Sequence, residues 1–386
     1  MKNKPLIILF DANPLVNGNK SGVGYYTYNL IESLAKTYPD EIKITAHYFN
    51  FLGRKNSARL PTHSNITYVQ SKLIPGKVLS LTRKLGFQIP LEFFFRKSGD
   101  VAIFTNFVSL PSMTNTPTFV AVHDLCYEEV PEYVSDKNQA FLHKFVPKSI
   151  KKSDKVITIS ESTKKAIKKF YKTSDKNIII TPIPPTKPVF KSKEYLEKFK
   201  IKNKYILFVS NLEPRKNFIN LVKAYEKLPS KTRDSCSLVL VGGKGWKIER
   251  QLEYIENLQK RGVDIVLTGY VSDDERASLY TNASLFVMPS HYEGFGMPIL
   301  EAMSYSLPTV ISDIPVFHEV AGANSTYFDK DDPNDMAKKI NKLLTDEKLS
   351  SDLSKKGLAH VKSYNWVNVS SLLYKEFLEI SKNKTT

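Results

Sequence analysis

The sequence contains very little cysteine. Cys126 and Cys236 are the two cysteines in 386 residues, and they lie far apart in the sequence, with no Cys-x-x-Cys pair. This excludes a disulfide framework and a zinc cluster, and it indicates a reducing compartment. Long apolar runs are also missing: none approaches the roughly 18 residues of a membrane span, and residues 6–10 (LIILF) are too short for a signal-peptide core. We expect a cytoplasmic protein, and peripheral attachment to the inner face of a membrane stays open.

Acidic residues are scarce relative to basic ones. Lys and Arg total 56 against 39 Asp and Glu, so the formal net charge is +17. Residues 54–97 hold nine basic side chains and one acid, Glu92, and residues 148–176 form a second basic run. One such run is ordinarily a solvated surface. Two in the first half favour a polyanionic neighbour, either an anionic membrane surface or a nucleic acid.

The basic stretch 72–97 also contains Leu91 and the phenylalanines Phe93 to Phe95. Such a mixture predicts either docking on an anionic membrane or a buried element with solvated lysines around it. No helix-turn-helix, ribonucleoprotein or zinc signature accompanies the basic charge. We therefore expect no nucleic-acid partner, and a basic nucleic-acid-binding protein is kept as the alternative from a different class.

Apolar runs typical of strands alternate with amphipathic runs typical of helices. In the first half we expect strands at 6–10, 44–49, 101–107, 118–125 and 155–160. The helices between some of them are expected at 26–36 and 162–171. After a proline-rich segment, further strands are expected at 205–210, 237–243, 264–270, 283–290 and 308–313. This alternation predicts an α/β protein with parallel sheets and crossover helices.

The domain boundaries follow from the proline-rich segment, which has four prolines within residues 181–190 and so cannot form a regular helix. We expect an N-terminal Rossmann-like domain at 1–182, a linker at 183–203 and a C-terminal Rossmann-like domain at 204–365. Residues 366–386 are expected to hold a final amphipathic helix.

In open α/β sheets, ligand groups lie at the carboxyl ends of the strands. After the first strand, Gly22 and Gly24 open a helix and let backbone N–H groups approach an anion. The third glycine of the dinucleotide fingerprint is missing, which argues against an NAD site. Later in this domain His123 and Asp124 end a strand. A structural histidine and a turn-capping aspartate explain them as well as a functional pair does.

In the second domain, Arg215 and Lys216 follow the first strand and precede a helix with Asn217 as its expected N-cap. Two cations at a helix N-terminus suit a diphosphate. The loop GYVSDDE presents Gly269, Tyr270 and Val271 at another strand end. Its acidic pair is best explained by helix capping from Ser272 rather than by metal binding.

The stretch HYEGFGMPILEAM, residues 291–303, carries two glutamates. Glu293 stands in a glycine-containing loop, and Glu301 is one turn inside a helix that Pro298 suits. The loop glycines, Gly294 and Gly296, leave backbone N–H groups such as that of Met297 open to a ligand. Two carboxylates beside one loop favour recognition of sugar hydroxyls, because carboxylates accept strong hydrogen bonds from O–H groups.

With these residues in place, the sequence resembles the retaining glycosyltransferases of family four, which use nucleotide sugars. Glu293 and Glu301 match the family's paired glutamates, and EGFGMPILEAM is typical of it. SGVGYYTYNL, VAVHDL, VITISESTKKAI, EPRKN, VGGKGW, TGYVSDDE and PVFHEVAGANSTYFDKDDP follow in the family's order. The resemblance implies the GT-B architecture, with two Rossmann-like domains facing a cleft and a C-terminal helix that crosses back to the first.

The resemblance also implies roles for individual residues. Arg215 and Lys216 would hold the donor diphosphate and stabilise the leaving group. Glu293 would bind the donor sugar, Glu301 the ribose hydroxyls, and His123 would lie near the transferred sugar. The remaining donor-side residues would be Gly294, Phe295, Gly296, Met297, Gly269, Tyr270, Val271, Gly22 and Gly24. Asp124 and Tyr25 would face the acceptor.

The implied reaction moves a hexose, with mannose as first choice, from a nucleotide sugar to a saccharide or lipid-linked saccharide during surface polysaccharide synthesis. GDP-mannose is the expected donor, with a UDP-sugar as the alternative. No Asp-x-Asp ends any of the strands expected above, so we expect no metal and no further cofactor. An epimerase or a phosphorylase of the same architecture, and a scaffold without activity, are the remaining alternatives.

Overall fold

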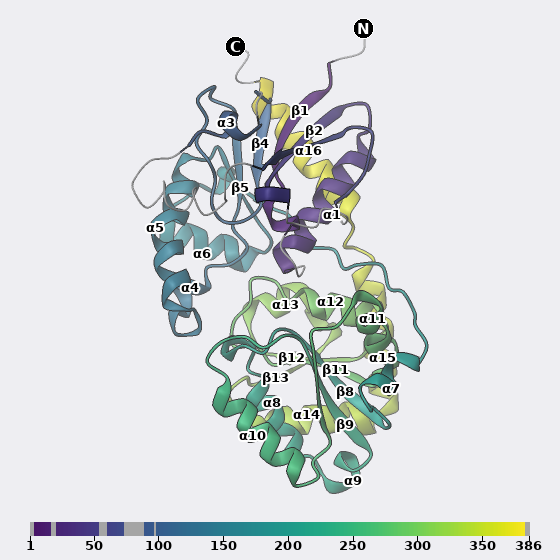
Figure 1. Cartoon of the computed structure of the whole chain (residues 1–386). Coiled ribbons are helices and arrows are strands. Elements are labelled where there is room, and N and C mark those ends of the chain that lie inside the picture. Colours follow the sequence, from purple (N-terminus) through teal and green to yellow (C-terminus); the bar gives the residue numbers. More distant parts are fainter. Residues whose placement is uncertain (1–3, 17–20, 54–59, 73–88, 96–97, 383–386) are drawn as a thin grey trace. The chain divides into compact units, whose positions relative to one another are not determined.

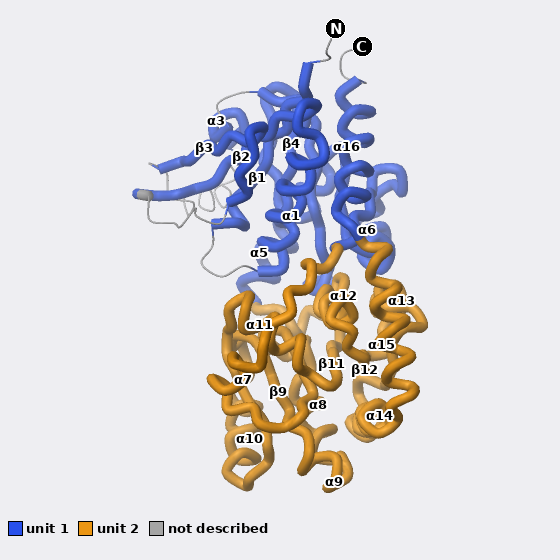
Figure 2. The backbone as a smooth tube through the Cα atoms, turned by 90° about the vertical axis from the view of Figure 1, so that its right-hand side faces the viewer, with its two compact units in different colours: residues 1–128, 136–183, 365–386 blue, residues 129–135, 184–364 orange. Residues whose placement is uncertain are grey.

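The computed structural model describes residues 4–16, 21–53, 60–72, 89–95 and 98–382. They form two compact units (Figure 2). Unit 1 comprises residues 1–128, 136–183 and 365–386, and unit 2 comprises residues 129–135 and 184–364. The chain therefore passes between the units near residues 128, 135, 183 and 364.

Unit 1 is built on a seven-stranded sheet in the order β3-β2-β1-β4-β5-β6-β7, and every strand pair is parallel. The strands are β1 (Leu6–Asp11), β2 (Ile42–Phe49), β3 (Ile66–Ser71), β4 (Val101–Phe104), β5 (Thr118–Ala121), β6 (Lys155–Thr158) and β7 (Ile178–Ile180). The five strands predicted here are confirmed. The sequence prediction omitted β3 and β7, because a polar-rich edge strand and a three-residue strand carry little periodicity.

The described helices of unit 1 cover this sheet (Figure 1). They are α1 (Gly22–Thr37), α3 (Leu91–Phe95), α4 (Cys126–Glu129), α5 (Asp136–Lys152), α6 (Glu161–Tyr171) and α16 (Trp366–Lys382). Helix α16 lies beside α1. The Tyr38 and Tyr374 rings stack 4.0 Å apart at this interface, and Ser370 hydrogen-bonds Ser33 in a buried position. The last segment of the chain thus belongs to the core of the first unit.

Helix α3 contains the aromatic stretch, and three of the four apolar residues named there are buried. Leu91, Phe94 and Phe95 are buried, and Phe94 and Phe95 pack near His47 and Phe49 of β2. Phe93 alone of the four points outward, with 60% of its surface exposed. The predicted basic residues at 54–59, 73–88 and 96–97 lie outside the described residues.

Unit 2 contains a six-stranded parallel sheet in the order β10-β9-β8-β11-β12-β13. Its strands are β8 (Lys204–Val209), β9 (Cys236–Val241), β10 (Ile265–Gly269), β11 (Leu285–Met288), β12 (Thr309–Ser312) and β13 (Thr326–Phe328). The five predicted strands are confirmed, and the short edge strand β13 was not anticipated. Asp329, Lys330 and Asp331 follow β13 directly, so the expectation that no Asp-x-Asp ends a strand is wrong. The sheet core is formed by fully buried aliphatic side chains such as Leu207, Val239 and Val287.

The helices of unit 2 connect these strands and pack around the sheet (Figure 1). They are α7 (Glu194–Lys198), α8 (Phe218–Glu226), α9 (Ser230–Arg233), α10 (Glu249–Lys260), α11 (Asp273–Asn282), α12 (Met297–Ser304), α13 (Pro315–Ala321), α14 (Pro333–Thr345) and α15 (Glu347–Val361). The predicted capping role of Ser272 is confirmed, because Ser272 and Glu275 form a reciprocal capping box at the start of α11. Pro298 lies in the first turn of α12, also as predicted.

The predicted capping by Asn217 is wrong in its side-chain detail. Asn217 precedes α8 in a left-handed conformation, and its side chain makes no capping bond. Its Nδ2 instead donates to the carbonyl of Lys330 at 2.8 Å. The side chain that the local sequence predicted to cap the helix is therefore bonded to a carbonyl that is distant in the sequence.

Among the described residues, no helix has both the length and the apolar character needed to cross a bilayer.

Candidate active site

The cationic pair of unit 2 lies at the carboxyl end of the central strand. Strand β8 is followed by a short 3-10 helix, Pro214–Lys216, which carries both Arg215 and Lys216. Strand β11, its neighbour in the sheet, is followed by the loop that carries Glu293. Because the carboxyl ends of neighbouring parallel strands meet at the same sheet edge, residues 77 and 78 positions apart come into contact.

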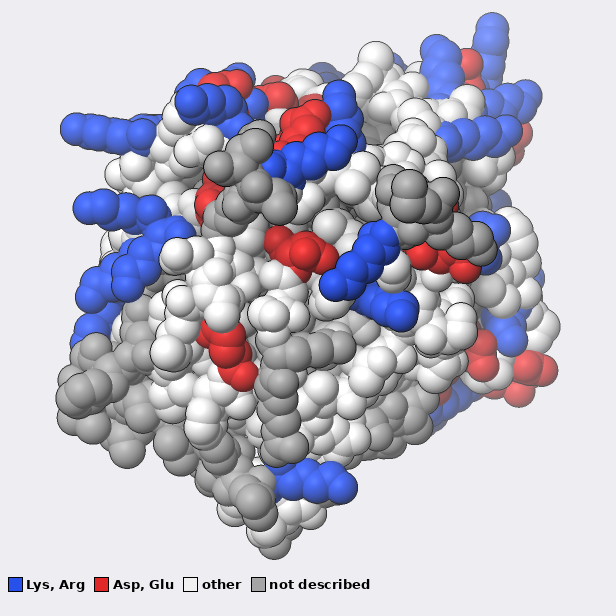
Figure 3. Space-filling view, turned by 90° about the horizontal axis from the view of Figure 1, so that it is seen from above, with Lys and Arg blue, Asp and Glu red and all other residues white. Residues whose placement is uncertain are grey.

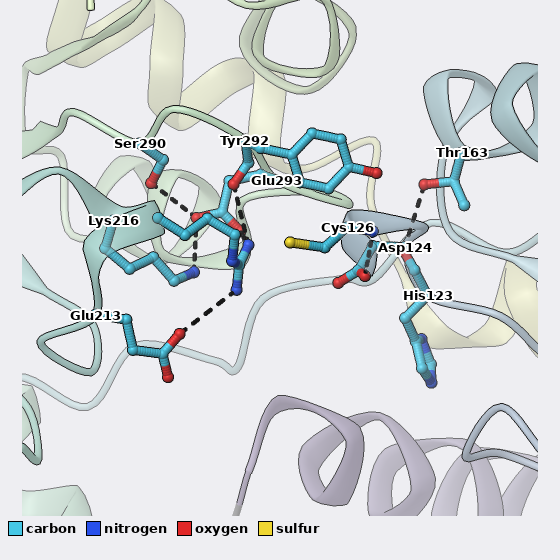
Figure 4. A network of polar contacts seen from close by, with 10 residues as sticks. His123, Asp124, Cys126, Thr163, Glu213, Lys216, Ser290, Tyr292 and Glu293 are labelled. Carbon is cyan, nitrogen blue, oxygen red and sulfur yellow. Dashed lines mark hydrogen bonds and ion pairs between the residues drawn. The ribbon is translucent and has the colours of Figure 1, made fainter. Parts of the chain in front are cut away.

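Glu293 is the centre of this contact. Its Oε2 accepts a hydrogen bond from Nη1 of Arg215 at 3.0 Å, and its Oε1 accepts from Nζ of Lys216 at 2.6 Å. The hydroxyl of Ser290 donates to Oε1 at 2.8 Å. Figure 4 shows Lys216 and Ser290 turned toward the carboxylate. The structure thus brings together three of the predicted catalytic residues, and Ser290 is a fourth member that sequence reasoning missed.

The charges of this cluster are strongly coupled because it is buried. Burial opposes ionisation of Glu293, but the charges of Lys216 and Arg215 and the hydrogen bonds to Lys216 and Ser290 outweigh it and lower its pKa. Burial and the neighbouring Arg215 lower the pKa of Lys216. Glu213 lies with Oε2 3.9 Å from Nη2 of Arg215, and burial raises its pKa. With all four side chains ionised, the two cations and two carboxylates balance.

Hydrogen bonds to backbone carbonyls join the two loops of this cluster. The amide of His291 donates to the carbonyl of Arg215 at 2.9 Å, and Nη1 of Arg215 donates to the carbonyl of Tyr292 at 3.0 Å. The ring of His291 stacks on Tyr133, with centroids 5.3 Å apart and planes 5° apart. Tyr133 comes from the short segment 129–135 that belongs to unit 2. Hydrogen bonds therefore fix both the backbone and the guanidinium group of Arg215.

Glu301 has a different partner. It lies on α12 in a buried position, and its Oε2 accepts a hydrogen bond from the hydroxyl of Tyr280 at 3.0 Å. Tyr280 belongs to α11 and is itself fully buried. The sequence prediction did not include Tyr280, which reads there as an ordinary apolar-face residue of a helix.

The loop before α12 depends on Gly296. This residue has φ of +97°, and a Cβ placed on it would lie 2.7 Å from Cε1 of Phe317. Only glycine satisfies both conditions without strain. Next to it Phe295 is buried, with its ring 6.2 Å from that of Tyr364. Gly294 and Met297 complete the turn into α12, where Gly296 occupies the N-cap position.

The loop after β10 is more open. Gly269 has φ of +69°, and no atom among the described residues lies within 4 Å of a Cβ placed on it. Tyr270 is exposed and Val271 is partly exposed. The predicted donor-side residues of this loop therefore present a solvent-accessible surface, and glycine is needed at 269 for its backbone conformation rather than for close packing.

In unit 1, His123 lies just after β5 and is buried. Its Nε2 lies 2.7 Å from the carbonyl oxygen of Thr105. A carbonyl can only accept, so Nε2 carries the proton. Burial lowers the pKa of His123, against the opposing effects of Thr105 and Asp124. The imidazole is therefore neutral at pH 7, and its Nδ1 has a lone pair for a hydrogen-bond donor.

Tyr26 links His123 to two points where the chain leaves unit 1. Its ring contacts His123 edge-on at 5.0 Å and lies 5.9 Å from the ring of Trp366. Its hydroxyl hydrogen-bonds Thr181 at 2.8 Å. Residues 183 and 365 are the last and first residues of unit 1 at these points. Tyr26, which stands where the dinucleotide fingerprint would have its third glycine, is thus a central packing residue.

The other predicted residues of unit 1 have identifiable local roles. Gly24 packs closely, because a Cβ on it would lie 3.1 Å from the carbonyl oxygen of Pro14, and its amide donates to the capping hydroxyl of Ser21. No atom of the described chain lies within 4 Å of a Cβ placed on Gly22. Asp124 accepts from the amide of Cys126 at 3.1 Å at the start of α4 (Figure 4). Tyr25 is half-buried on the first turns of α1. Close packing at Gly24 and turn capping by Asp124 are the local roles that the structure shows for these two residues.

Comparisons with known proteins add to this geometry. The model of the family described as glycosyl transferases group 1 matches residues 191–360. O-antigen chain mannosyltransferase B of Escherichia coli is 31% identical over 253 residues, covering 64% of this chain and 66% of that protein, just under two thirds of its length. O-antigen chain mannosyltransferase RfbU of Salmonella typhimurium is 29% identical over 329 residues, covering 81% of this chain and 85% of that protein.

The fold also matches solved structures. The Anabaena protein HepE, solved in complex with UDP and glucose, superposes with a TM-score of 0.70 at 15% identity, covering 97% of this chain and 100% of that chain. Two parallel-sheet units, each flanked by helices, are the GT-B architecture, and this prediction is confirmed. Residues 191–360 thus carry the sequence pattern of the glycosyl transferases group 1 family.

Proposed function

We propose that this protein transfers a hexose, with mannose as first choice, from a nucleotide sugar to a saccharide or lipid-linked saccharide in surface polysaccharide synthesis. The transfer retains the configuration of the sugar and needs no metal. The observation that carries this proposal is the buried cluster of Arg215, Lys216 and Glu293 at the carboxyl end of β8. The mannosyltransferases named above support the choice of sugar.

The cluster suits the charge that develops during glycosyl transfer. When the bond between the anomeric carbon and the donor phosphate breaks, negative charge builds on the departing diphosphate. Arg215 and Lys216 are preorganised cations in a buried setting, where loss of one such donor costs on the order of 10²-fold in rate. They supply the stabilisation for which other enzymes use a divalent metal.

Carboxylates and a neutral imidazole then supply sugar recognition. Glu293 binds hydroxyls of the donor sugar, and Glu301 binds those of the ribose. Nδ1 of His123 accepts a hydrogen bond from a hydroxyl of the transferred sugar, because Nε2 is already engaged by Thr105. GDP-mannose is the proposed donor. The UDP in the HepE complex keeps a UDP-sugar as the alternative.

The donor is tested by binding. Thermal shift and calorimetry with GDP, UDP, ADP and dTDP, each with and without EDTA, are compared for the wild type and Glu301→Ala. We expect one nucleotide to stabilise the wild type regardless of EDTA and to stabilise the variant much less. Binding that EDTA abolishes would refute metal independence. Failure of all four nucleotides to bind would refute the donor site.

Retention and reaction type are tested on the product. With the nucleotide sugar identified above and a saccharide acceptor, the anomeric configuration of the new linkage is read by NMR coupling constants. The same configuration as in the donor is expected, and inversion would refute the proposal. An epimerase would form product without an acceptor, and a phosphorylase would require inorganic phosphate, so the same assay separates these alternatives.

We also propose that unit 1 docks on an anionic membrane, where a lipid-linked acceptor would lie. Unit 1 carries 29 Lys and Arg against 14 Asp and Glu, a net +15, whereas unit 2 carries 27 against 25, a net +2. The described charged residues are not one continuous patch: Figure 3 shows basic side chains both at the edges and near the middle of one face, with acidic ones among them. Charge alone therefore does not locate the docking surface.

Exposed apolar side chains support one site for this docking surface. Phe93 and Met113 have exposed fractions of 60% and 75%. The two segments that carry them are joined by hydrogen bonds to Glu92. Its carboxylate accepts hydrogen bonds from the Ser112 hydroxyl and from the amides of Met113 and Thr114. A pocket of about 220 Å³ beside Ser112 is lined by Lys148 and Lys152. An apolar pair next to lysines suits an anionic bilayer interface.

Vesicle sedimentation tests this surface. We expect binding to phosphatidylcholine vesicles that contain phosphatidylglycerol, weakened by salt, and little binding to pure phosphatidylcholine. Phe93→Ser with Met113→Ser should reduce binding, whereas Val367→Ser with Leu372→Ser, two exposed apolar residues of α16, should not. Equal binding by both double variants would refute the proposed surface. A salt-sensitive shift of DNA without vesicle binding would favour the nucleic-acid alternative.

A further inference from the structure

The two oxygens of the Glu301 carboxylate have different surroundings. Oε2 accepts a hydrogen bond from the Tyr280 hydroxyl at 3.0 Å. Among the residues that the structure describes, no hydrogen-bond partner reaches Oε1. A buried carboxylate with one oxygen held and the other available is set to accept a further O–H donor, since each oxygen carries two lone pairs.

Tyr280 is built to hold that carboxylate in one orientation. Its side chain is 1% exposed, its ring stacks on Tyr305 with centroids 5.3 Å and planes 12° apart, and Phe286 lies 6.0 Å away on another side. Burial and the charge of Glu301 raise the pKa of the Tyr280 hydroxyl well above its usual range. The hydroxyl therefore stays protonated and donates.

Tyr305 in turn is fixed by the proline-rich segment. Its hydroxyl accepts a hydrogen bond from the amide of Val189 at 3.1 Å, and its ring contacts that of Phe190 at 5.6 Å. Segment 184–190 belongs to unit 2 and directly follows the point where the chain leaves unit 1. The orientation of Glu301 thus depends on two stacked tyrosine rings that are anchored outside α12.

We infer that Tyr280 is a positioning residue that orients Glu301 toward the ribose hydroxyls of the bound nucleotide, and that Tyr305 supports it. This inference rests on the proposed function, in which Glu301 is the ribose ligand. A carboxylate free to rotate would lose part of its hydrogen-bond energy to ordering, whereas one already held in place keeps it. Alternatively, the hydrogen bond between Tyr280 and Glu301 stabilises the fold only, and its loss would leave ribose recognition unaffected.

The two possibilities differ in what they do to ribose discrimination. Affinities for GDP and for 2′,3′-dideoxy-GDP, or for UDP and its dideoxy form if UDP is the better ligand, are measured by calorimetry. The ratio of the two affinities reports the ribose contacts alone, because base and diphosphate are unchanged. For the wild type we expect a preference for the ribonucleotide of about tenfold or more, the range of hydrogen bonds to a charged group.

Three variants and a matched control complete the experiment. Glu301→Gln and Tyr280→Phe should each remove most of the preference, and Tyr305→Leu should reduce it in part. The control is Tyr225→Phe, since the Tyr225 hydroxyl is also buried in unit 2 and donates to the carbonyl of Cys236 at 2.7 Å. It should lose some thermal stability but keep the full ribose preference.

The outcomes separate the inference from the function on which it rests. A wild-type preference that Tyr280→Phe keeps, while Glu301→Gln loses it, would overturn the positioning role and leave the donor site intact. A wild type without ribose preference would refute Glu301 as the ribose ligand, and the inference with it. If Tyr280→Phe does not fold, Tyr305→Leu decides: an unchanged preference in that variant counts against positioning through the tyrosine stack.

Discussion

Replacing Glu293 by glutamine tests the electrostatics of the cluster most directly. In the structure this carboxylate engages both cations, with Oε2 3.0 Å from Nη1 of Arg215 and Oε1 2.6 Å from Nζ of Lys216. It therefore occupies part of the cationic surface that a donor diphosphate would use. Glutamine keeps the size and most hydrogen-bonding capacity of the side chain but removes its negative charge. The four ionised groups of the cluster then change from balanced to net +1.

The size of the effect follows from the geometry. A unit charge about 5 Å from a diphosphate at an effective dielectric constant of about 20 interacts with ~3 kcal/mol. The loss of its charge also lowers the pKa of the buried Lys216 further, which offsets part of that gain. We therefore expect GDP to bind Glu293→Gln about tenfold more tightly than wild type, a gain of ~1.4 kcal/mol. The same variant should transfer sugar far more slowly, because the contact of Glu293 with the donor sugar is weakened.

Calorimetric titration of GDP, repeated at low and high salt, measures this effect. Glu301→Gln is the matched comparison, since it has the same chemical change on the other glutamate and should weaken GDP binding. Opposite signs for the two variants would distinguish a carboxylate that competes with the diphosphate from one that binds the ribose. If Glu293→Gln bound GDP no better than wild type, the view of Glu293 as an internal counter-ion would be refuted.

Three further variants test separate parts of the structure. Arg215→Lys keeps the charge but loses the paired guanidinium geometry, and it should lower the transfer rate by about 10²-fold, measured as turnover of the nucleotide sugar. Gly296→Ala should unfold at a markedly lower temperature than Gly269→Ala: both have positive φ, but a Cβ at Gly296 would lie 2.7 Å from Phe317 while none would meet an atom within 4 Å at Gly269. Equal losses would show that backbone conformation alone matters. Burial lowers the pKa of His123 in the folded state, so the unfolded state binds the extra proton below about pH 6.5 and the free energy of unfolding should fall there, by at most about 1.4 kcal/mol per pH unit for this group. Denaturant unfolding is measured between pH 5 and 7, and the free energy of unfolding of His123→Gln should change less with pH than that of the wild type. An equal change with pH in both proteins would contradict the neutral buried imidazole.

The sequence by itself determined the features that depend on neighbouring residues. Alternating apolar runs located ten strands of the two parallel sheets, because strand periodicity and crossover helices are local patterns. The capping box of Ser272 and the helix start at Pro298 were readable for the same reason. The family motifs pointed to Arg215, Lys216, Glu293 and Glu301 as site residues, although Glu293 meets the two cations across 77 and 78 residues and Glu301 meets Tyr280 across 21. The resemblance, rather than spacing, therefore carried those assignments.

Only the tertiary structure decided which side chains meet. Glu293 contacts Lys216 across 77 residues, and Tyr280 reaches Glu301 from a different helix. Asn217 turned away from the predicted cap because the carbonyl of Lys330 lies within reach. Phe93 and Phe94 are chemically identical neighbours, yet one is exposed and the other buried, according to which face of α3 meets β2. A hydrogen bond or a buried face depends on the partner that the fold places opposite, and that partner is not encoded in the local pattern of the chain.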